Sequence, residues 1–148
     1  MPDSPKPPEY LVDRSLGKRV VPQALRGAGR IVHTLAEVFG SREESVTDEE
    51  WIARAGAEGW VVLTKDKRIR TKQAEREVVR RHRVRLFCVT KGGLTGDDQA
   101  QRLVDNLARI ERVARRPGPY IYAVHERRLE QLWSPPRKRT GRGRRRRR

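Results

Sequence analysis

Residues 47–70 read TDEEWIARAGAEGWVVLTKDKRIR, and this stretch gives the strongest indication of the fold class. Thr47 and the three acids after it are typical of a helix start, because Thr47 can cap the helix and Glu50 completes a capping box. The run 60–64 is apolar, as in strands that are covered on both faces. Asp66 lies just past that run. The stretch therefore predicts a helix, a buried strand and a carboxylate at the strand's carboxyl end.

Strand-like and helix-like segments alternate along the rest of the chain. The predicted strands are residues 10–12, 31–34, 60–64, 84–89 and 120–124. The predicted helices are residues 21–25, 47–58, 73–83 and 97–115, and residues 37–45 are expected to form a loop. This order favours an α/β fold, a three-layer α/β/α arrangement with a central, mainly parallel sheet of about five strands.

The composition indicates a basic protein with a polyanionic partner. The chain has 148 residues, its formal net charge is +16, and 36% of its residues are charged against 35% hydrophobic. The last twelve residues contain nine Lys or Arg and no acid, which leaves 26 basic and 19 acidic residues, or +7, for the rest. Because the body is basic without its tail, a polyanion such as a nucleic acid is the expected partner.

Three segments are expected along the chain. Residues 1–8 contain four prolines and are predicted to be a disordered lead-in, and residues 134–148 a disordered Arg-rich tail. Residues 9–133 form the single folded domain between them. The tail has two open interpretations, a nonspecific grip on RNA or ribosomes and a solubilising segment.

Several classes of protein are excluded by the same sequence. Cys88 is the only cysteine, so an intramolecular disulfide and a cysteine-based zinc cluster are excluded. No stretch approaches the ~20 apolar residues of a membrane span, and the N-terminal residues have no apolar segment of signal type. A cytoplasmic protein without a membrane partner is expected.

Three acids are expected to meet at one edge of the sheet. Asp13 follows the run 10–12 as Asp66 follows the run 60–64, and Asp48 opens the helix before the second of these strands. The carboxyl ends of parallel strands lie at the same edge, where sites form in such sheets. Carboxylates gathered there repel one another unless a cation binds, and their oxygens suit Mg²⁺. The acids therefore predict a divalent-metal site.

Each acid also has an ordinary structural interpretation. Asp48 fits the first turn of a helix, Asp66 fits a turn after a strand, and Asp13 can pair with Arg14. The repulsion argument adds a prediction, namely that Asp66→Asn raises the melting temperature of the protein without metal. A fall would instead indicate a role for Asp66 as a cap or turn residue.

This pattern resembles the PIN-like domains, especially the short VapC-type domains of bacterial toxins. In that family an Asp ends the first strand, as Asp13 does here, and a later Asp opens a helix that leads into a strand closed by Thr-x-Asp. Asp48 lies 18 residues before Asp66, and residues 64–66 are Thr-Lys-Asp. The resemblance covers residues 9–124 and makes residues 9–133 a PIN-like nuclease domain.

The resemblance implies a metal-dependent endoribonuclease, the toxin of a type II toxin–antitoxin pair. Asp13, Asp48 and Asp66 would be catalytic and would hold one or two Mg²⁺ or Mn²⁺ ions, which activate a water and stabilise the leaving oxygen. RNA and an antitoxin protein are the implied partners, and a homodimer is left open. The phosphate- or RNA-binding side chains would be Thr64, Lys65, Lys67, Arg68 and Arg70. Thr64 has the alternative of bonding a carboxylate or a bound water.

The fourth acid of longer PIN domains has no obvious counterpart. Those domains place a Glu on a helix in mid-chain, and Glu37, Glu43 and Glu44 lie in that region without a clear helix. One of them substitutes, or three acids suffice, or activity is lost. Two other functions stay open, a non-catalytic RNA- or ribosome-binding protein with the same fold and an interaction protein whose tail docks an acidic partner.

Overall fold

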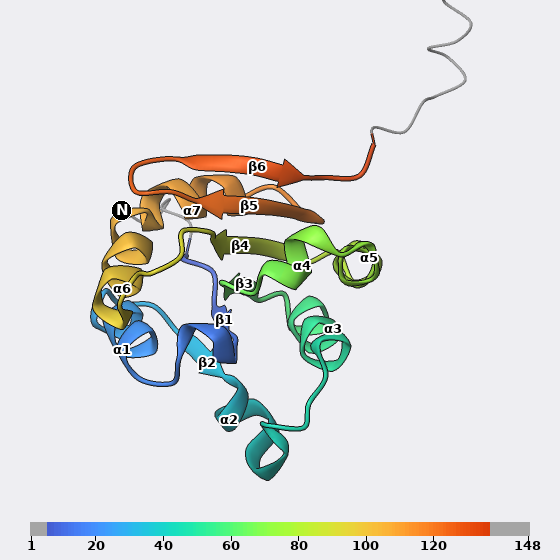
Figure 1. Ribbon diagram of the computed structural model, residues 1–148, viewed down its shortest axis with the longest axis horizontal. Coiled ribbons are helices and arrows are strands. Elements are labelled where there is room, and N and C mark those ends of the chain that lie inside the picture. The colour runs from blue at the N-terminus through green and yellow to red at the C-terminus, as the bar shows by residue number, and fades with distance from the viewer. Residues whose placement is uncertain (1–5, 137–148) are drawn as a thin grey trace, which may run out of the picture.

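One sheet organises the molecule (Figure 1). The structure, a computed structural model, describes residues 6–136 apart from the side chains of Lys67 and Arg70. The six strands follow the order β2-β1-β3-β4-β5-β6, in which β6 alone is antiparallel to its neighbour. The strands are β1 (Tyr10–Val12), β2 (Val32–Thr34), β3 (Val61–Thr64), β4 (Arg85–Val89), β5 (Tyr120–Val124) and β6 (Leu129–Trp133).

Helices cover both faces of this sheet and complete the three predicted layers. The helices are α1 (Val20–Gly27), α2 (Leu35–Phe39), α3 (Asp48–Glu58), α4 (Lys67–Thr71), α5 (Gln73–Arg81), α6 (Gly96–Asp105) and α7 (Leu107–Ala114), with short 3₁₀ helices η1 (Arg14–Leu16) and η2 (Gly40–Arg42). Residues of α1, α6 and α7 share one apolar core with the sheet, and residues of α2, α3, α4 and α5 share the other. The prediction of a three-layer α/β/α fold is confirmed.

The strands show why the sequence runs are apolar throughout. In β1, Tyr10 and Val12 belong to the core on one face, whereas Leu11 belongs to the core on the other. All three side chains are at most 1% exposed. Side chains of a strand alternate between the two faces, so a strand with both faces covered needs apolar residues at every position.

The predicted helix start at Thr47 is confirmed. The Thr47 hydroxyl accepts a hydrogen bond from the Glu50 backbone N–H at 3.1 Å, and the Glu50 carboxylate accepts one from the Thr47 N–H at 3.0 Å. The helix α3 ends at Gly59, which adopts the left-handed conformation (φ 76°) that glycine reaches without a steric penalty. Local residues therefore fix both ends of α3.

The prediction of a loop over residues 37–45 is wrong in its first part. Residues of α2 form a short helix there, capped by Thr34, whose hydroxyl accepts from the Glu37 N–H at 3.2 Å. η2 follows it directly. A five-residue helix has too few turns to show an apolar period, which is why the sequence pattern looked irregular.

The predicted helix over residues 97–115 is two helices that meet at Asn106. The buried Asn106 amide donates to the carbonyl oxygens of Arg102 (2.8 Å), His125 (2.9 Å) and Glu126 (3.2 Å). Two of these acceptors lie in the turn after β5, some twenty residues away. The apolar stripe continues across the break, so periodicity alone does not reveal it.

The sheet also gains a strand beyond the five predicted. The edge strand β6 pairs with β5 through a short turn, and most of its side chains are exposed. An exposed edge strand needs no apolar run, so the sequence gives little sign of it.

The neighbouring strands β1 and β3 bring the predicted acids to one edge. Val12 is in register with Leu63, and the Asp13 N–H donates to the Leu63 carbonyl oxygen at 3.2 Å. Residues 1–5 of the predicted lead-in and residues 137–148 of the predicted tail lie outside the described residues. Within residues 6–136, no helix is long and apolar enough to cross a membrane.

Candidate active site

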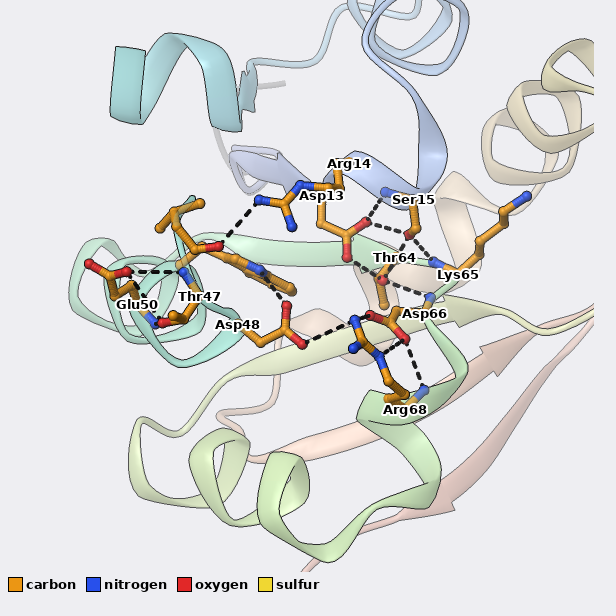
Figure 2. Close-up of polar contacts among 12 residues, drawn as sticks. Asp13, Arg14, Ser15, Thr47, Asp48, Glu50, Thr64, Lys65, Asp66 and Arg68 are labelled. Carbon is orange, nitrogen blue, oxygen red and sulfur yellow. Dashed lines mark hydrogen bonds and ion pairs between the residues drawn. The ribbon is translucent and has the colours of Figure 1, made fainter. Parts of the chain in front are cut away.

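Asp13 is a buried carboxylate held by two hydroxyl groups (Figure 2). Its residue is 3% exposed, because it follows a fully buried strand. Oδ1 accepts hydrogen bonds from the Ser15 N–H at 2.8 Å and from the Ser15 hydroxyl, and Oδ2 accepts one from Thr64 Oγ1 at 2.7 Å. Burial raises the pKa of Asp13, although these hydrogen bonds oppose the rise. The hydrogen bonds therefore fix the orientation of the Asp13 carboxylate, and burial makes its charged form less stable than it is in water.

Thr64 connects Asp13 to the chain around Asp66. Its hydroxyl donates to Asp13 and accepts from the Asp66 N–H at 3.0 Å. Thr64 is fully buried, so its hydroxyl does not face solvent where an RNA phosphate would lie. In this structure Thr64 makes the hydrogen bond to a carboxylate that was its alternative role, and RNA binding by Thr64 stays a prediction.

Ser15 was missed by the sequence reasoning. Besides its two hydrogen bonds to Asp13, its hydroxyl accepts from the Lys65 N–H at 2.9 Å and lies 3.2 Å from Thr64 Oγ1. Ser15 therefore ties the turn after β1 to the turn after β3. The available signal was its position two residues after Asp13, where a polar side chain often closes a turn with an aspartate.

Asp66 caps the helix that follows it and pairs with that helix's Arg68. Oδ1 accepts from the Arg68 backbone N–H at 2.9 Å and from Arg68 Nε at 3.2 Å, and Oδ2 accepts from Arg68 Nη2 at 2.9 Å. The hydrogen bonds from the Arg68 side chain lower the pKa of Asp66, against the effect of partial burial. Asp66 is thus stabilised as a carboxylate, unlike Asp13.

Asp48 faces the same guanidinium from the first turn of α3. Its Oδ1 accepts from Trp51 Nε1 at 3.0 Å, and its Oδ2 lies 3.6 Å from Arg68 Nη2. The Oδ2 atoms of Asp48 and Asp66 therefore lie within the sum of their distances to that nitrogen, 6.5 Å, of each other. Figure 2 shows Arg68 between the two carboxylates.

The oxygen donors are of the kind that Mg²⁺ or Mn²⁺ binds. The described residues contain no group of three or more His, Cys, Asp or Glu side chains placed to hold a metal ion. A positive group, the Arg68 guanidinium, lies between Asp48 and Asp66, and the nearby Asp66 charge is one of the influences that raise the pKa of Asp13, after burial. The donor set at this edge consists of hard carboxylate oxygens, which is the chemistry that a divalent ion such as Mg²⁺ or Mn²⁺ prefers.

The three candidates for a fourth acid differ in their surroundings. Glu37 lies on α2, where it completes the cap at Thr34 and pairs with Arg26 at 2.9 Å. The Glu43 side chain pairs with Lys18 at 3.0 Å. Glu44 is exposed.

Glu43 is the candidate that is bound to the segment after β1. Its carbonyl oxygen accepts from Arg14 Nη2 at 2.6 Å, and Arg14 directly follows Asp13. Arg14 Nη2 also donates to the Val46 carbonyl oxygen at 3.3 Å, and the Arg14 charge contributes to the low pKa of Asp66. Arg14 therefore holds the loop of Glu43 beside the acids, rather than forming the ion pair with Asp13 that the sequence also allowed.

The predicted phosphate-binding residues divide into three cases. Lys65 is exposed beside Asp66, as a phosphate contact requires. Arg68 is paired with two acids and is not free for phosphate in this arrangement. Lys67 and Arg70 lie on α4, but their side chains are outside the described part of the structure.

The chain is similar in sequence to known proteins over most of its length. Residues 8–91 match the family described as PIN-like domain, which is more than half of the chain. A protein of Mycobacterium tuberculosis, VapC45, which bears the name of a candidate ribonuclease, is 44% identical over 116 residues. That alignment spans 78% of this chain and 84% of the relative. No solved structure matches the chain.

Proposed function

The chain belongs to the PIN-like domain family, and from that premise we propose that it is a metal-dependent endoribonuclease, the toxin of a type II toxin–antitoxin pair. The observation that carries the proposal is the arrangement of Asp13, Asp48 and Asp66 at one sheet edge, linked through Thr64 and Arg68. The ribonuclease name of the relative supports RNA as the substrate. An antitoxin protein is the proposed partner, and the cytoplasm is the proposed place of action.

Asp13, Asp48 and Asp66 are assigned to holding Mg²⁺ or Mn²⁺. When bound, such an ion supplies an activated water and positive charge for the leaving oxygen of a phosphodiester. Ser15 and Thr64 already fix the Asp13 carboxylate by hydrogen bonds, so this side chain would lose little conformational freedom when it binds the ion. Glu43 is the proposed fourth acid, because Arg14 holds its loop beside Asp13.

The basic residues beside the acids are assigned to the RNA phosphates. A site built from carboxylates repels a polyanion, and nearby cations offset that repulsion. Lys65 is exposed for this role, and Arg68 can take it after it leaves Asp48 and Asp66. Lys67 and Arg70 remain predictions from the sequence.

RNA cleavage by the purified protein tests the proposal. Cleavage of RNA in Mg²⁺ or Mn²⁺ is expected, together with its loss in EDTA and in Asp13→Asn and Asp66→Asn. Asp105→Asn is the matched control, since Asp105 lies at the end of α6 and contacts Gln101 instead of the acids. Cleavage that persists in both Asp13→Asn and Asp66→Asn contradicts the site assignment.

A second candidate is a non-catalytic RNA-binding protein with this fold. The observation in its favour is Arg68, which covers two of the three acids. This function predicts tight, salt-sensitive RNA binding without cleavage in any divalent metal. The same cleavage experiment therefore separates the two functions.

A further inference from the structure

A basic groove runs along α5, on a part of the surface that the acids do not use. Two adjoining hollows of about 280 and 480 Å³ share Glu77, Arg80 and Pro136 as lining residues. Together they extend from Gln73, at the start of α5, to Arg83, just beyond its end. We call this surface the α5 groove.

Four arginines line the α5 groove against one acid. Arg76 lines the first hollow, Arg81 and Arg83 line the second, and Arg80 lines both, whereas Glu77 is the acid. Positive charge concentrated in a concave surface attracts anionic ligands, such as phosphate groups.

Two of these arginines have no ion-pair partner among residues 6–136. The Arg83 side chain is exposed and makes no hydrogen bond within that range. Nε of Arg76 is buried and also lacks a hydrogen-bond partner there. Buried donors are normally satisfied in folded proteins, so an unpaired one beside a hollow indicates a ligand or water.

The other two arginines make only exposed ion pairs. Arg80 lies 3.3 Å from Glu77, and Arg81 lies 3.2 Å from Glu49, with all four side chains at least 49% exposed. Exposed pairs contribute little to stability, so a phosphate can replace or share them at small cost.

The backbone at Arg83 ends α5 and sets where its side chain lies. Arg83 follows the C-cap His82 and adopts the left-handed conformation (φ 56°) in which many helices end. The Val84 N–H donates to the Val79 carbonyl oxygen at 3.1 Å, which closes this helix end. The helix stop therefore places the Arg83 side chain at the far end of the groove.

The opposite wall of the groove comes from the end of the chain. Trp133, at the end of β6, lines the first hollow and is half-buried, and Pro135 and Pro136 follow it. Figure 1 shows β6 ending on the side of the molecule where α5 lies. An aromatic ring beside arginines is the combination on which unpaired bases stack while phosphates are neutralised. The Arg-rich residues 137–148 continue directly from this wall in sequence.

We propose that the α5 groove binds a single-stranded segment of RNA, with Arg76, Arg80 and Arg83 on its phosphates and Trp133 against a base. The proposal rests on the proposed function, because it extends the binding of the same RNA beyond the acids. α5 packs against α4, the short helix that Asp66 caps, so the groove begins one short helix away from the acids.

Two matched double variants test the groove. Arg80→Gln/Arg83→Gln removes two groove cations, and Arg109→Gln/Arg112→Gln removes two exposed cations, also three residues apart, from α7 on the other face of the sheet. Binding of a labelled single-stranded RNA of about 20 nucleotides is measured by fluorescence anisotropy in EDTA, with the full chain and over a range of salt concentrations.

The groove variant is expected to bind roughly tenfold more weakly, with a salt dependence that is shallower by about 1.4 log units per log unit of salt, as two lost phosphate contacts require. The α7 variant is expected to bind like the unchanged protein. Equal weakening of both variants overturns the groove, because it shows a general effect of net charge. Unchanged binding by the groove variant overturns it too.

Cleavage in Mn²⁺ keeps this test distinct from that of the proposed function. If the unchanged protein cuts RNA and the groove variant binds RNA normally, the groove proposal is wrong and the nuclease assignment stands. If the protein does not cut RNA but the groove variant binds more weakly than the α7 variant, the groove stands and the nuclease assignment fails.

Discussion

Nη2 of Arg68 lies 2.9 Å from Oδ2 of Asp66, and the same nitrogen is 3.6 Å from Oδ2 of Asp48. One guanidinium thus faces two of the three acids. Pairing with Asp66 and Asp48 raises the pKa of Arg68, so this group keeps its charge at any ordinary pH. A divalent ion that binds these oxygens has to compete with it.

Arg68→Gln is therefore expected to increase the affinity for Mn²⁺. Removing this positive charge should lower the Kd for the ion severalfold, as measured by titration calorimetry, with a smaller effect at high salt because the Arg68 side chain is exposed. Arg54→Gln is the control, because Arg54 pairs with Glu58 on the exposed face of α3 at 3.0 Å. Weaker Mn²⁺ binding by Arg68→Gln would show that Arg68 helps to organise the acids for metal.

Asp13→Asn is expected to stabilise the protein in EDTA. Burial raises the pKa of Asp13, so the folded protein binds a proton more tightly than the unfolded chain. Stability then falls as the pH rises above the ordinary Asp value, and the neutral Asn avoids this loss. A rise in Tm of about 2–4 °C is expected at pH 7 and a smaller one near pH 4, by thermal unfolding. A Tm that falls equally at both pH values would mean that the hydrogen bonds to Ser15 and Thr64 outweigh burial.

Asp66→Asn is expected to lower the Tm in EDTA, the reverse of what charge repulsion alone predicted. The carboxylate pairs with Arg68, which lowers the pKa of Asp66, so the ionised form stabilises the fold above the ordinary Asp value. That stabilisation is lost as the pH falls through the lowered pKa. Thermal unfolding should show a decrease of about 2–4 °C at pH 7. If Asp66→Asn and the unchanged protein have equal Tm values, the ion pair between Asp66 and Arg68 does not stabilise the protein in solution.

Thr64→Val is expected to destabilise the fold and abolish RNA cleavage. Valine has nearly the same shape, but it leaves Oδ2 of Asp13 and the Asp66 N–H without their buried partner. The expected loss is about 1–3 kcal/mol in urea unfolding. Thr64→Ser keeps the hydroxyl and should retain cleavage, so equal loss in both variants would point to the methyl group and its packing.

Gly56→Ala is expected to destabilise the contact between α3 and α5 by about 2 kcal/mol or more in urea unfolding. A Cβ at Gly56 would overlap the backbone carbonyl oxygen of His82, far inside van der Waals contact. Gly27→Ala is the control, since a Cβ there meets nothing within 4 Å and alanine favours the helix. Similar stability of both variants would show that the two helices can separate without cost.

The sequence predicted the features that local residues determine. Thr47 and Glu50 bond to each other within one turn, so their pattern predicted both the helix and its first residue. The positions of Asp13 and Asp66 after apolar strands predicted a shared edge, because parallel neighbours end together.

Contacts between residues that are distant in the sequence could not be predicted from it. Ser15 is one polar residue among many until β1 and β3 become neighbours and its hydroxyl meets the Lys65 N–H. Arg68 looked like a phosphate ligand, because nothing in the spacing from Asp48 to Arg68 shows that their side chains converge. The sequence shows the charge of Arg68 but not that its side chain lies between Asp48 and Asp66.

Asn106 has a consequence for how the molecule opens. Its amide group fastens the junction of α6 and α7 to the carbonyl oxygens of His125 and Glu126 in the turn between β5 and β6. These four elements follow residue 91, where the match to the PIN-like family ends. Since α6, α7 and β5 share one apolar core with α1, β1 and β3, this single side chain couples only the junction of α6 and α7 to the turn between β5 and β6. Local opening of either one should therefore expose the backbone amide hydrogens of both to exchange.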